Sequence, residues 1–132
     1  MKRSHNSSED SERGAVAVEF ALVAPILIAL IIAIVEFSNA YNVQVSVTQA
    51  SREAARTMAI TKDATKATAA GKAGAPSINS SLLTFDYSAA TCPATAPAST
   101  ALVTVRYSGS SLTGFFGSTL TITGKGAMQC GG

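Results

Sequence analysis

A single carboxylate stands inside the longest apolar run of this chain. Between Ala15 and Val35, Glu19 is the only charged residue. A helix of about 20 residues reaches roughly 30 Å, which is the thickness of the hydrocarbon core of a bilayer. A carboxylate within such a span costs about 3 kcal/mol even on the lenient insertion scale. We therefore expect Glu19 to have a partner of opposite charge.

The apolar run itself offers no such partner, because the nearest cation is Arg13, on the other side of Gly14. Cleavage of the bond between Gly14 and Ala15 would create an ammonium group on Ala15, and Glu19 would then be the fifth residue of the product. These two positions lie one helical turn apart, so their charges can pair within one chain or between neighbouring copies. Such a cleavage would therefore supply the partner that Glu19 lacks.

This arrangement is similar to that of type IV pilins and pseudopilins, in which a prepilin peptidase cleaves after the glycine of a charged leader. In those proteins a glutamate five residues further on directs assembly. Residues 13–60 resemble the TadE-like family of pseudopilins through an RGxxxVEFALxxP opening, a second VEF at 35–37 and SREAAR at 51–56. The resemblance implies a subunit of a tight-adherence (Tad/Flp) pilus system, a type IV filament machine that secretes adhesive pili.

The resemblance also implies site residues and partners. It makes Gly14 and Ala15 the cleavage site, and it assigns assembly to Glu19, Phe20 and Pro25. The expected partners are the prepilin peptidase, other pilin or pseudopilin subunits, the pilus assembly platform and membrane lipid. A minor role is expected, because the major subunits of this pilus class are shorter and lack a sizeable head.

Two further residues of the helix have two interpretations each. Pro25 removes one backbone hydrogen bond, which predicts a kink or local loosening that would help extraction from the bilayer or bending in a filament. A tolerated membrane proline is the alternative. Glu36 ends the apolar run and marks the outer interface of the membrane, and a contact with a neighbouring subunit is the second interpretation.

The basic residues predict the topology. Lys2, Arg3 and Arg13 lie before the apolar run, whereas the first cation after it is Arg52. By the positive-inside rule the N-terminus is cytoplasmic and the chain after about residue 36 is outside. The expected location is the cytoplasmic (inner) membrane as a single-pass protein, with incorporation into a surface pilus after assembly.

Composition argues against other classes of function. The net charge of +2 is too small to imply nucleic acid. The only histidine, His5, lies in the predicted leader, and the rest of the chain has no glycine-rich phosphate loop and no nucleophile with a candidate base. We therefore expect no enzyme, no cofactor and no metal site.

The two cysteines, Cys92 and Cys130, fall in the part predicted to be outside, where an oxidising compartment favours pairing. A disulfide would close a loop of about 39 residues and stabilise a small domain by roughly 3 to 4 kcal/mol on the loop-entropy model. Two free buried thiols are the alternative.

The expected organisation is a leader (1–14) without regular structure, a transmembrane and assembly helix (15–35) and an extracytoplasmic head domain (36–132). The helix should continue to about residue 60, because small and apolar residues recur on one face at spacings of three and four. These residues are Val43, Val47, Ala50, Ala54 and Met58, and the opposite face carries Gln44, Gln49, Arg52, Glu53 and Arg56.

After this helix, the sequence predicts a short helix at about 62–70, capped by Thr61 or Asp63 and ended by Gly71. The hydrophobic period then changes to two, which predicts strands at about 82–88, 101–107 and 119–124. An antiparallel sheet of three strands needs a cover for its apolar face, and the long helix provides one. The expected fold class is α+β, with a long N-terminal helix packed on a small sheet, as in pilins.

Phe115 and Phe116 lie between two glycines in the predicted connection between the last two strands. They form either an exposed contact for another subunit or a part of the domain core.

Two other functions remain open from the sequence. An exported soluble protein would use the apolar run as a signal peptide, with Ser38 and Ala40 as the small residues before a cut after Ala40. A permanently membrane-anchored accessory protein would keep the run and display a β-rich module outside.

Overall fold

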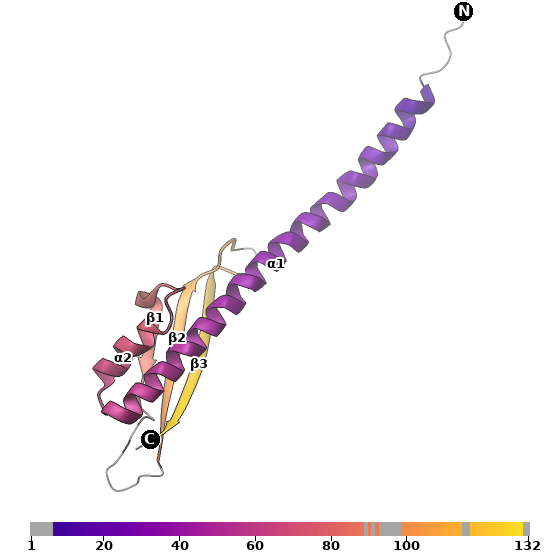
Figure 1. Ribbon diagram of the computed structural model, residues 1–132. Coiled ribbons are helices and arrows are strands. Elements are labelled where there is room, and N and C mark those ends of the chain that lie inside the picture. Colours follow the sequence, from indigo (N-terminus) through magenta and orange to yellow (C-terminus); the bar gives the residue numbers. More distant parts are fainter. Residues whose placement is uncertain (1–6, 89, 91, 93–98, 115–116, 131–132) are drawn as a thin grey trace, which may run out of the picture. The chain divides into compact units, whose positions relative to one another are not determined.

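The computed structural model describes residues 7–88, 90, 92, 99–114 and 117–130, with side chains from Glu12 onward. The chain forms two compact units, Met1–Val35 and Glu36–Gly132. Its elements are α1 (Ser7–Thr61), α2 (Ala64–Ala73), a 3₁₀ turn η1 (Ser80–Leu82) and strands β1 (Leu83–Asp86), β2 (Thr100–Ser110) and β3 (Thr119–Gln129). Figure 1 shows the strands beside the second half of α1.

The helix α1 begins earlier than expected, because residues 7–14 are helical. The sequence predicted no regular structure there because residues 1–14 show no hydrophobic periodicity. A helix that packs against no other element needs no such periodicity, so its absence does not exclude a helix. This part of α1 contains Glu9, Asp10 and Glu12, and acidic residues in the first turns of a helix interact favourably with its dipole. From there α1 continues through Pro25.

The sheet has three antiparallel strands in the order β1-β2-β3, as predicted. In the register Phe85 pairs with Val105, and Val105 pairs with Gly124. The hairpin of β2 and β3 is longer than the sequence indicated, because its ladder continues to Ser110 and Gln129. Glycines and polar residues at these ends weaken the alternation from which the strands were predicted, while the ladder needs only backbone groups.

The core of the head lies between one face of α1 and one face of the sheet. The predicted stripe is confirmed: Val43, Val47, Ala50 and Ala54 are buried, and Met58 packs against the same cluster. Opposite this stripe lie the buried strand residues Ala101, Val103, Val105 and Ile122. The polar face of α1, from Gln44 to Arg56, is exposed as expected. The α+β, pilin-like architecture is therefore confirmed.

Two glycines of β3 set the distance between α1 and the sheet. A Cβ at Gly124 would lie 2.9 Å from the backbone oxygen of Val47, and one at Gly126 would overlap the backbone carbonyl of Ser51. Real Cβ atoms are not found at such separations, so the helix backbone lies directly against β3. The strand predicted from the sequence ends at about residue 124 and does not include Gly126, so this contact was not predicted.

The helix α2 begins as predicted, because Asp63 is its N-cap and accepts hydrogen bonds from the backbone N–H groups of Thr65 and Lys66. Its predicted end at Gly71 is wrong, since α2 continues to Ala73 and is capped by Gly74. Gly71 is buried, and a Cβ there would lie 3.0 Å from the carbonyl oxygen of Ala50 and overlap the ring of Phe85. This glycine is therefore needed for close packing rather than for termination.

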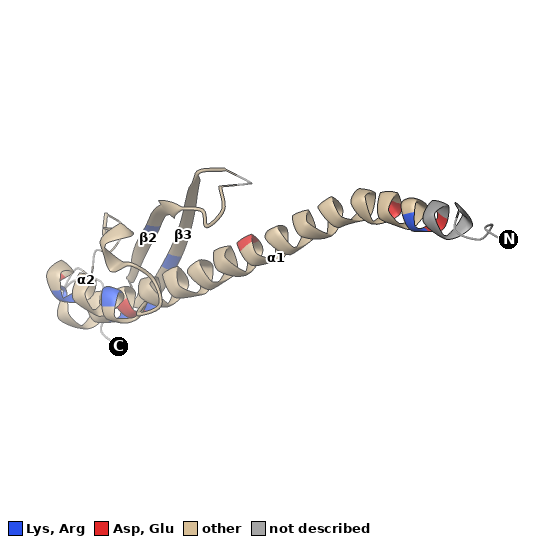
Figure 2. Ribbon diagram, turned by 90° about the horizontal axis from the view of Figure 1, so that it is seen from above, with Lys and Arg blue, Asp and Glu red and all other residues tan. Residues whose placement is uncertain are grey.

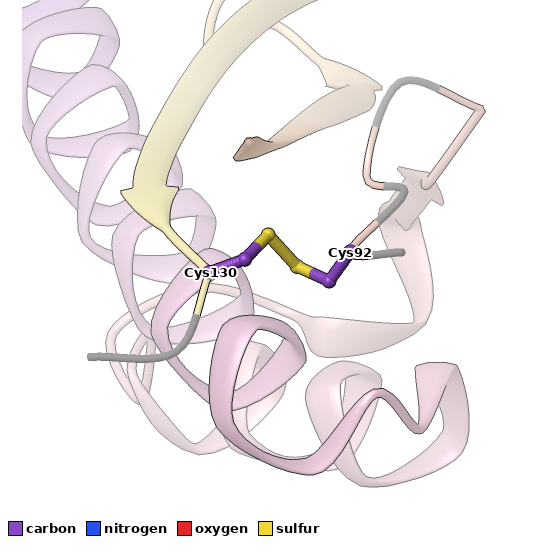
Figure 3. Close-up of a disulfide and its surroundings, with 2 residues drawn as sticks. All are labelled: Cys92 and Cys130. Carbon is purple, nitrogen blue, oxygen red and sulfur yellow. A yellow bond between two sulfur atoms is a disulfide. The ribbon is translucent and has the colours of Figure 1, made fainter. Parts of the chain in front are cut away.

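The predicted disulfide between Cys92 and Cys130 is present, with the two Cα atoms 5.5 Å apart. Figure 3 shows that it joins the residue after β3 to the segment that follows β1. The backbone N–H of Cys130 also donates to the carbonyl oxygen of Ser99 at 2.8 Å. The C-terminal end of β3 is thus held by a covalent bond and a hydrogen bond.

Candidate assembly and processing site

The predicted cleavage site lies within α1. Gly14 is the only glycine among the 55 residues of this helix, and a Cβ built on it would meet no atom within 4 Å. Gly14 and Ala15 are both exposed. A glycine weakens a helix by about 1 kcal/mol relative to alanine, so this exposed position is one of low helix propensity.

The residues after Gly14 expose apolar side chains on every side of the helix. Examples are Phe20 at 70%, Leu22 at 69% and Ile26 at 67% exposure. Figure 2 shows that Lys, Arg, Asp and Glu are nearly absent from this part of α1. Among the described residues, α1 is the one helix that is long and apolar enough to cross a membrane. A helix that is apolar all round requires lipid or other helices around it.

Glu19 is exposed within this apolar surface, between Val18 and Phe20. Within the part of the chain that the structure describes, no hydrogen bond or ion pair involves its carboxylate. An unpaired carboxylate is costly once such a surface is surrounded by lipid or by other helices. In the uncleaved chain, Glu19 therefore has no partner of opposite charge among the described residues.

Glu36 has a partner within its own chain. Its Oε1 accepts a hydrogen bond from the backbone N–H of Thr113 at 2.6 Å and a second one from the Thr113 hydroxyl. The side-chain hydrogen bond and then the backbone hydrogen bond hold the pKa of Glu36 below its ordinary value of 4.5. No local pattern indicates this contact, because 77 positions separate the two residues in the sequence.

Two further features of the sequence remain, the predicted contact pair and the SREAAR segment. Phe115 and Phe116 lie outside the described residues. The SREAAR segment is divided between the core and the surface: Ser51, Ala54 and Ala55 are buried, while the charged residues are exposed. This division shows that the motif serves packing of the head as well as presenting charges to solvent.

The described residues contain no group of three or more His, Cys, Asp or Glu side chains that could hold a metal ion. Comparison with known families gives one result: residues 14–56 match the family model of the TadE-like proteins. No curated protein and no solved structure matches the chain significantly. The family match begins at Gly14 and ends at Arg56, so it includes Glu19, Pro25, Glu36 and the SREAAR segment. Over residues 14–56, the chain is therefore similar to the TadE-like family.

Proposed function

We propose that this protein is a minor pilin or pseudopilin, a structural subunit of a Tad/Flp-type pilus assembly and secretion machine. TadE-like proteins are structural, pilus-associated proteins rather than enzymes. The observation that carries the proposal is an apolar helix in which a glycine precedes the run and Glu19, the one carboxylate of the run, has no partner among the described residues. An apolar helix with an unpaired carboxylate is stabilised when neighbouring helices cover its surface and supply a partner for the charge.

Processing is the first step of the proposed function. The chain inserts with its N-terminus in the cytoplasm, and the prepilin peptidase cleaves after Gly14. The exposure of Gly14 and its low helix propensity support this assignment, because a peptidase must reach and unwind the bond that it cleaves. Cleavage removes the leader and converts Ala15 into a charged N-terminus.

Assembly is the second step. The mature helix packs against helices of identical or related subunits, and Glu19 pairs with the Ala15 ammonium group of a neighbour. In an apolar surrounding, any other stagger of the helices leaves a charge unpaired at a cost of several kcal/mol. The pair therefore fixes the register of neighbouring subunits.

The proposal is tested by mass spectrometry of the N-terminus of the membrane-extracted protein, from cells with and without the prepilin peptidase. We expect a start at Ala15 that depends on the peptidase. A start at Tyr41 would instead indicate a signal peptide, and an intact N-terminus in both strains would indicate a membrane anchor. Either of these results contradicts the proposal.

The variant Gly14→Leu sharpens this test. A side chain at residue 14 meets no neighbouring atom, so the variant should fold and insert normally but remain uncut. Gly14→Ala is the matched control, because it removes glycine with the smallest increase in size. Normal cleavage of Gly14→Leu would show that the assigned bond is wrong.

A further inference from the structure

We propose that the outer face of the sheet, the face that does not pack against α1, binds a polysaccharide whose sugar units carry carboxylates. The site is formed by side chains of β1, β2 and β3, which all belong to the unit Glu36–Gly132. The proposal therefore does not depend on the proposed cleavage, membrane insertion or assembly of this chain. It gives the head domain a binding activity of its own.

The first step is the position of two basic residues. Arg106 of β2 and Lys125 of β3 are exposed, and they are the only basic residues of the three strands. Figure 2 shows basic residues on both strands. In the register Arg106 lies opposite Thr123, and Lys125 lies opposite Thr104. The two cations are therefore diagonal neighbours on one face, with their Cβ atoms about 7 Å apart.

The second step is that neither cation is engaged inside the head. Within the described part of the chain, no hydrogen bond or ion pair involves the side chain of Arg106 or Lys125. A guanidinium group can bind a carboxylate through two parallel hydrogen bonds, and an ammonium group supplies a compact second charge. Because two neighbouring cations repel each other, an anion that binds between them also removes this repulsion. The pair is thus suited to carboxylates of a ligand.

The third step is the polar surroundings of these cations. The site consists of two cross-strand rows of side chains, Thr84, Arg106 and Thr123 in one row and Asp86, Thr104 and Lys125 in the other. Threonine hydroxyls both donate and accept hydrogen bonds, and those of the two rows form none with other described residues. Asp86 accepts a hydrogen bond from the backbone N–H of Ser88 at 2.9 Å, and a carboxylate has further acceptor positions. The rows therefore offer donors and acceptors to sugar hydroxyls.

The fourth step is the shape of this face. It contains a shallow hollow of about 200 Å³. The hollow is lined by Thr84, Phe85, Asp86, Thr104 and Arg106. Sites that enclose a whole small molecule are typically about 300 to 1,000 Å³ in volume, so this hollow is too small for one. It can hold one unit of a polymer whose neighbouring units lie over the exposed strands.

The mixture of charges favours an acidic saccharide over other polymers. Asp86 repels a ligand that presents only carboxylates, but it accepts hydrogen bonds from sugar hydroxyls. A protein partner would need apolar or aromatic anchors at the centre of its interface, and the two rows contain only threonine and charged residues. The unit Glu36–Gly132 contains seven Lys and Arg residues against four Asp and Glu residues, so its field attracts an anionic polymer.

The test measures binding of the detergent-solubilised, full-length chain to polygalacturonate by isothermal titration calorimetry, without divalent cations. Methyl-esterified polygalacturonate keeps the hydroxyls and loses the charges, whereas polyglutamate keeps the charges and has no hydroxyls. We expect polygalacturonate to bind at least about tenfold more tightly than either control polymer, because only it uses both kinds of contact. Absence of binding to polygalacturonate, or equal binding of either control polymer, would overturn the proposal.

The two cations are tested together. Arg106→Gln combined with Lys125→Gln should weaken binding of polygalacturonate by about tenfold or more, because both charged donors are lost. Lys66→Gln combined with Lys72→Gln is the matched control, since it removes two exposed cations of α2 and changes the net charge equally. Circular dichroism should give the same melting temperature for the first double variant as for the parent chain. An equal loss of binding in both double variants would show general attraction by charge and overturn the site.

Asp86→Asn tests the preference for a saccharide. The amide removes the repulsion of carboxylates and is a weaker acceptor for sugar hydroxyls, while its oxygen can still accept from Ser88. The ratio of the affinities for polygalacturonate and polyglutamate should therefore fall. Glu53→Gln is the control, because Glu53 is an exposed carboxylate of α1 outside this face. An unchanged ratio in Asp86→Asn would contradict the role of Asp86 in selecting the ligand.

Discussion

At the scale of single residues, Glu19 inside the apolar run and Glu36 directly after it differ in their hydrogen bonding. Glu19 has no hydrogen-bond or ion-pair partner within the described part of the chain, whereas Glu36 accepts two hydrogen bonds from Thr113. A carboxylate that is already satisfied has little to gain from a neighbouring subunit. The difference supports Glu19 as the assembly residue and gives Glu36 a role inside the head.

The first prediction concerns Glu19. Glu19→Val removes a cost of about 3 kcal/mol for a carboxylate in the membrane, so the variant should insert and be cleaved as well as the parent chain. It should nevertheless fail to assemble, because the Ala15 ammonium group loses its partner. Cleavage is measured by mass spectrometry and assembly by the amount of subunit in sheared filaments. Glu53→Gln is the control, and normal filaments from Glu19→Val would contradict the assembly role.

The second prediction concerns pH. The pKa of Glu36 is lower in the folded head than its ordinary value of 4.5, because Thr113 stabilises the charged form. Its contribution to stability is therefore complete above pH 4.5 and is lost as the pH falls through the lowered pKa. The melting temperature of the parent chain should fall in this acidic range. Asp86, whose pKa is lowered by its hydrogen bonds to Ser88, acts in the same direction.

Glu36→Gln separates the two carboxylates, because it leaves Asp86 unchanged and cannot titrate. The melting temperature of this variant, followed by circular dichroism, should depend less on pH in the acidic range than that of the parent chain. Equal pH dependence in the two proteins would show that the hydrogen bonds of Glu36 contribute nothing to folding.

At the scale of elements, the packing of α1 on the sheet depends on small residues on both sides. Alanines line the buried face of the helix, and glycines of β3 lie beneath its backbone. Small residues allow close approach, and close approach gives each atom more partners for dispersion. The same principle applies where Gly71 of α2 meets the carbonyl of Ala50 and the ring of Phe85.

The third prediction tests this packing. Gly126→Ala places a Cβ into the backbone carbonyl of Ser51 and within 2.8 Å of the Arg52 nitrogen. Because backbone atoms cannot rotate away, the variant should lose about 1 to 3 kcal/mol of unfolding free energy. Urea unfolding of the detergent-solubilised chain measures this loss. Lys125→Ala, on the exposed neighbour of Gly126, should change stability by less than about 0.5 kcal/mol, and equal effects in both variants would contradict the close approach.

The fourth prediction concerns the connection between α1 and α2. Lys62 has a φ of 55°, in the left-handed region, and its N–H donates to the carbonyl of Met58 at 2.9 Å. Glycine adopts this conformation without steric cost, so Lys62→Gly should stabilise the head by a few tenths to about 1 kcal/mol. Lys66→Gly, within α2, should destabilise it by about 1 kcal/mol. The sign of the two changes in urea unfolding is the test, and a loss in both would contradict the assigned backbone conformation.

At the scale of the whole molecule, the chain combines two units with different surroundings. The N-terminal unit exposes apolar side chains that need lipid or other helices. The unit from Glu36 to Gly132 has its own core and a disulfide that closes a sequence separation of 38 residues. The unit from Glu36 to Gly132 therefore has stabilising contacts of its own.

The fifth prediction follows from this arrangement. Replacing both Cys92 and Cys130 by serine should lower the unfolding free energy of the head by about 3 to 4 kcal/mol, because the unfolded chain regains the entropy of an open loop. The midpoint of urea unfolding, compared between the parent chain under non-reducing conditions and the variant, measures the loss. A reductant should shift the parent chain towards the variant and leave the variant unchanged. No shift in the parent chain would contradict the pairing.

The sequence by itself determined the features that depend on neighbours along the chain. The apolar run around Glu19, the small-residue stripe of α1, the cap at Asp63 and the alternating strands all follow from local spacing. The pairing of Cys92 with Cys130 follows from the presence of two cysteines, both in the part predicted to be outside the membrane. Each of these signals repeats at a period or stands at a fixed offset, so it can be read without a structure.

Only the tertiary structure decided the contacts between distant segments. The hydrogen bonds of Thr113 to Glu36 and the approach of α1 to Gly124 and Gly126 join residues more than 70 positions apart. A glycine in a strand is equally consistent with a turn, a bulge or a close contact. A threonine in a loop can donate a hydrogen bond, but its residue type does not indicate which group accepts it. Such contacts arise from the packing of whole elements, and no local pattern in the sequence records them.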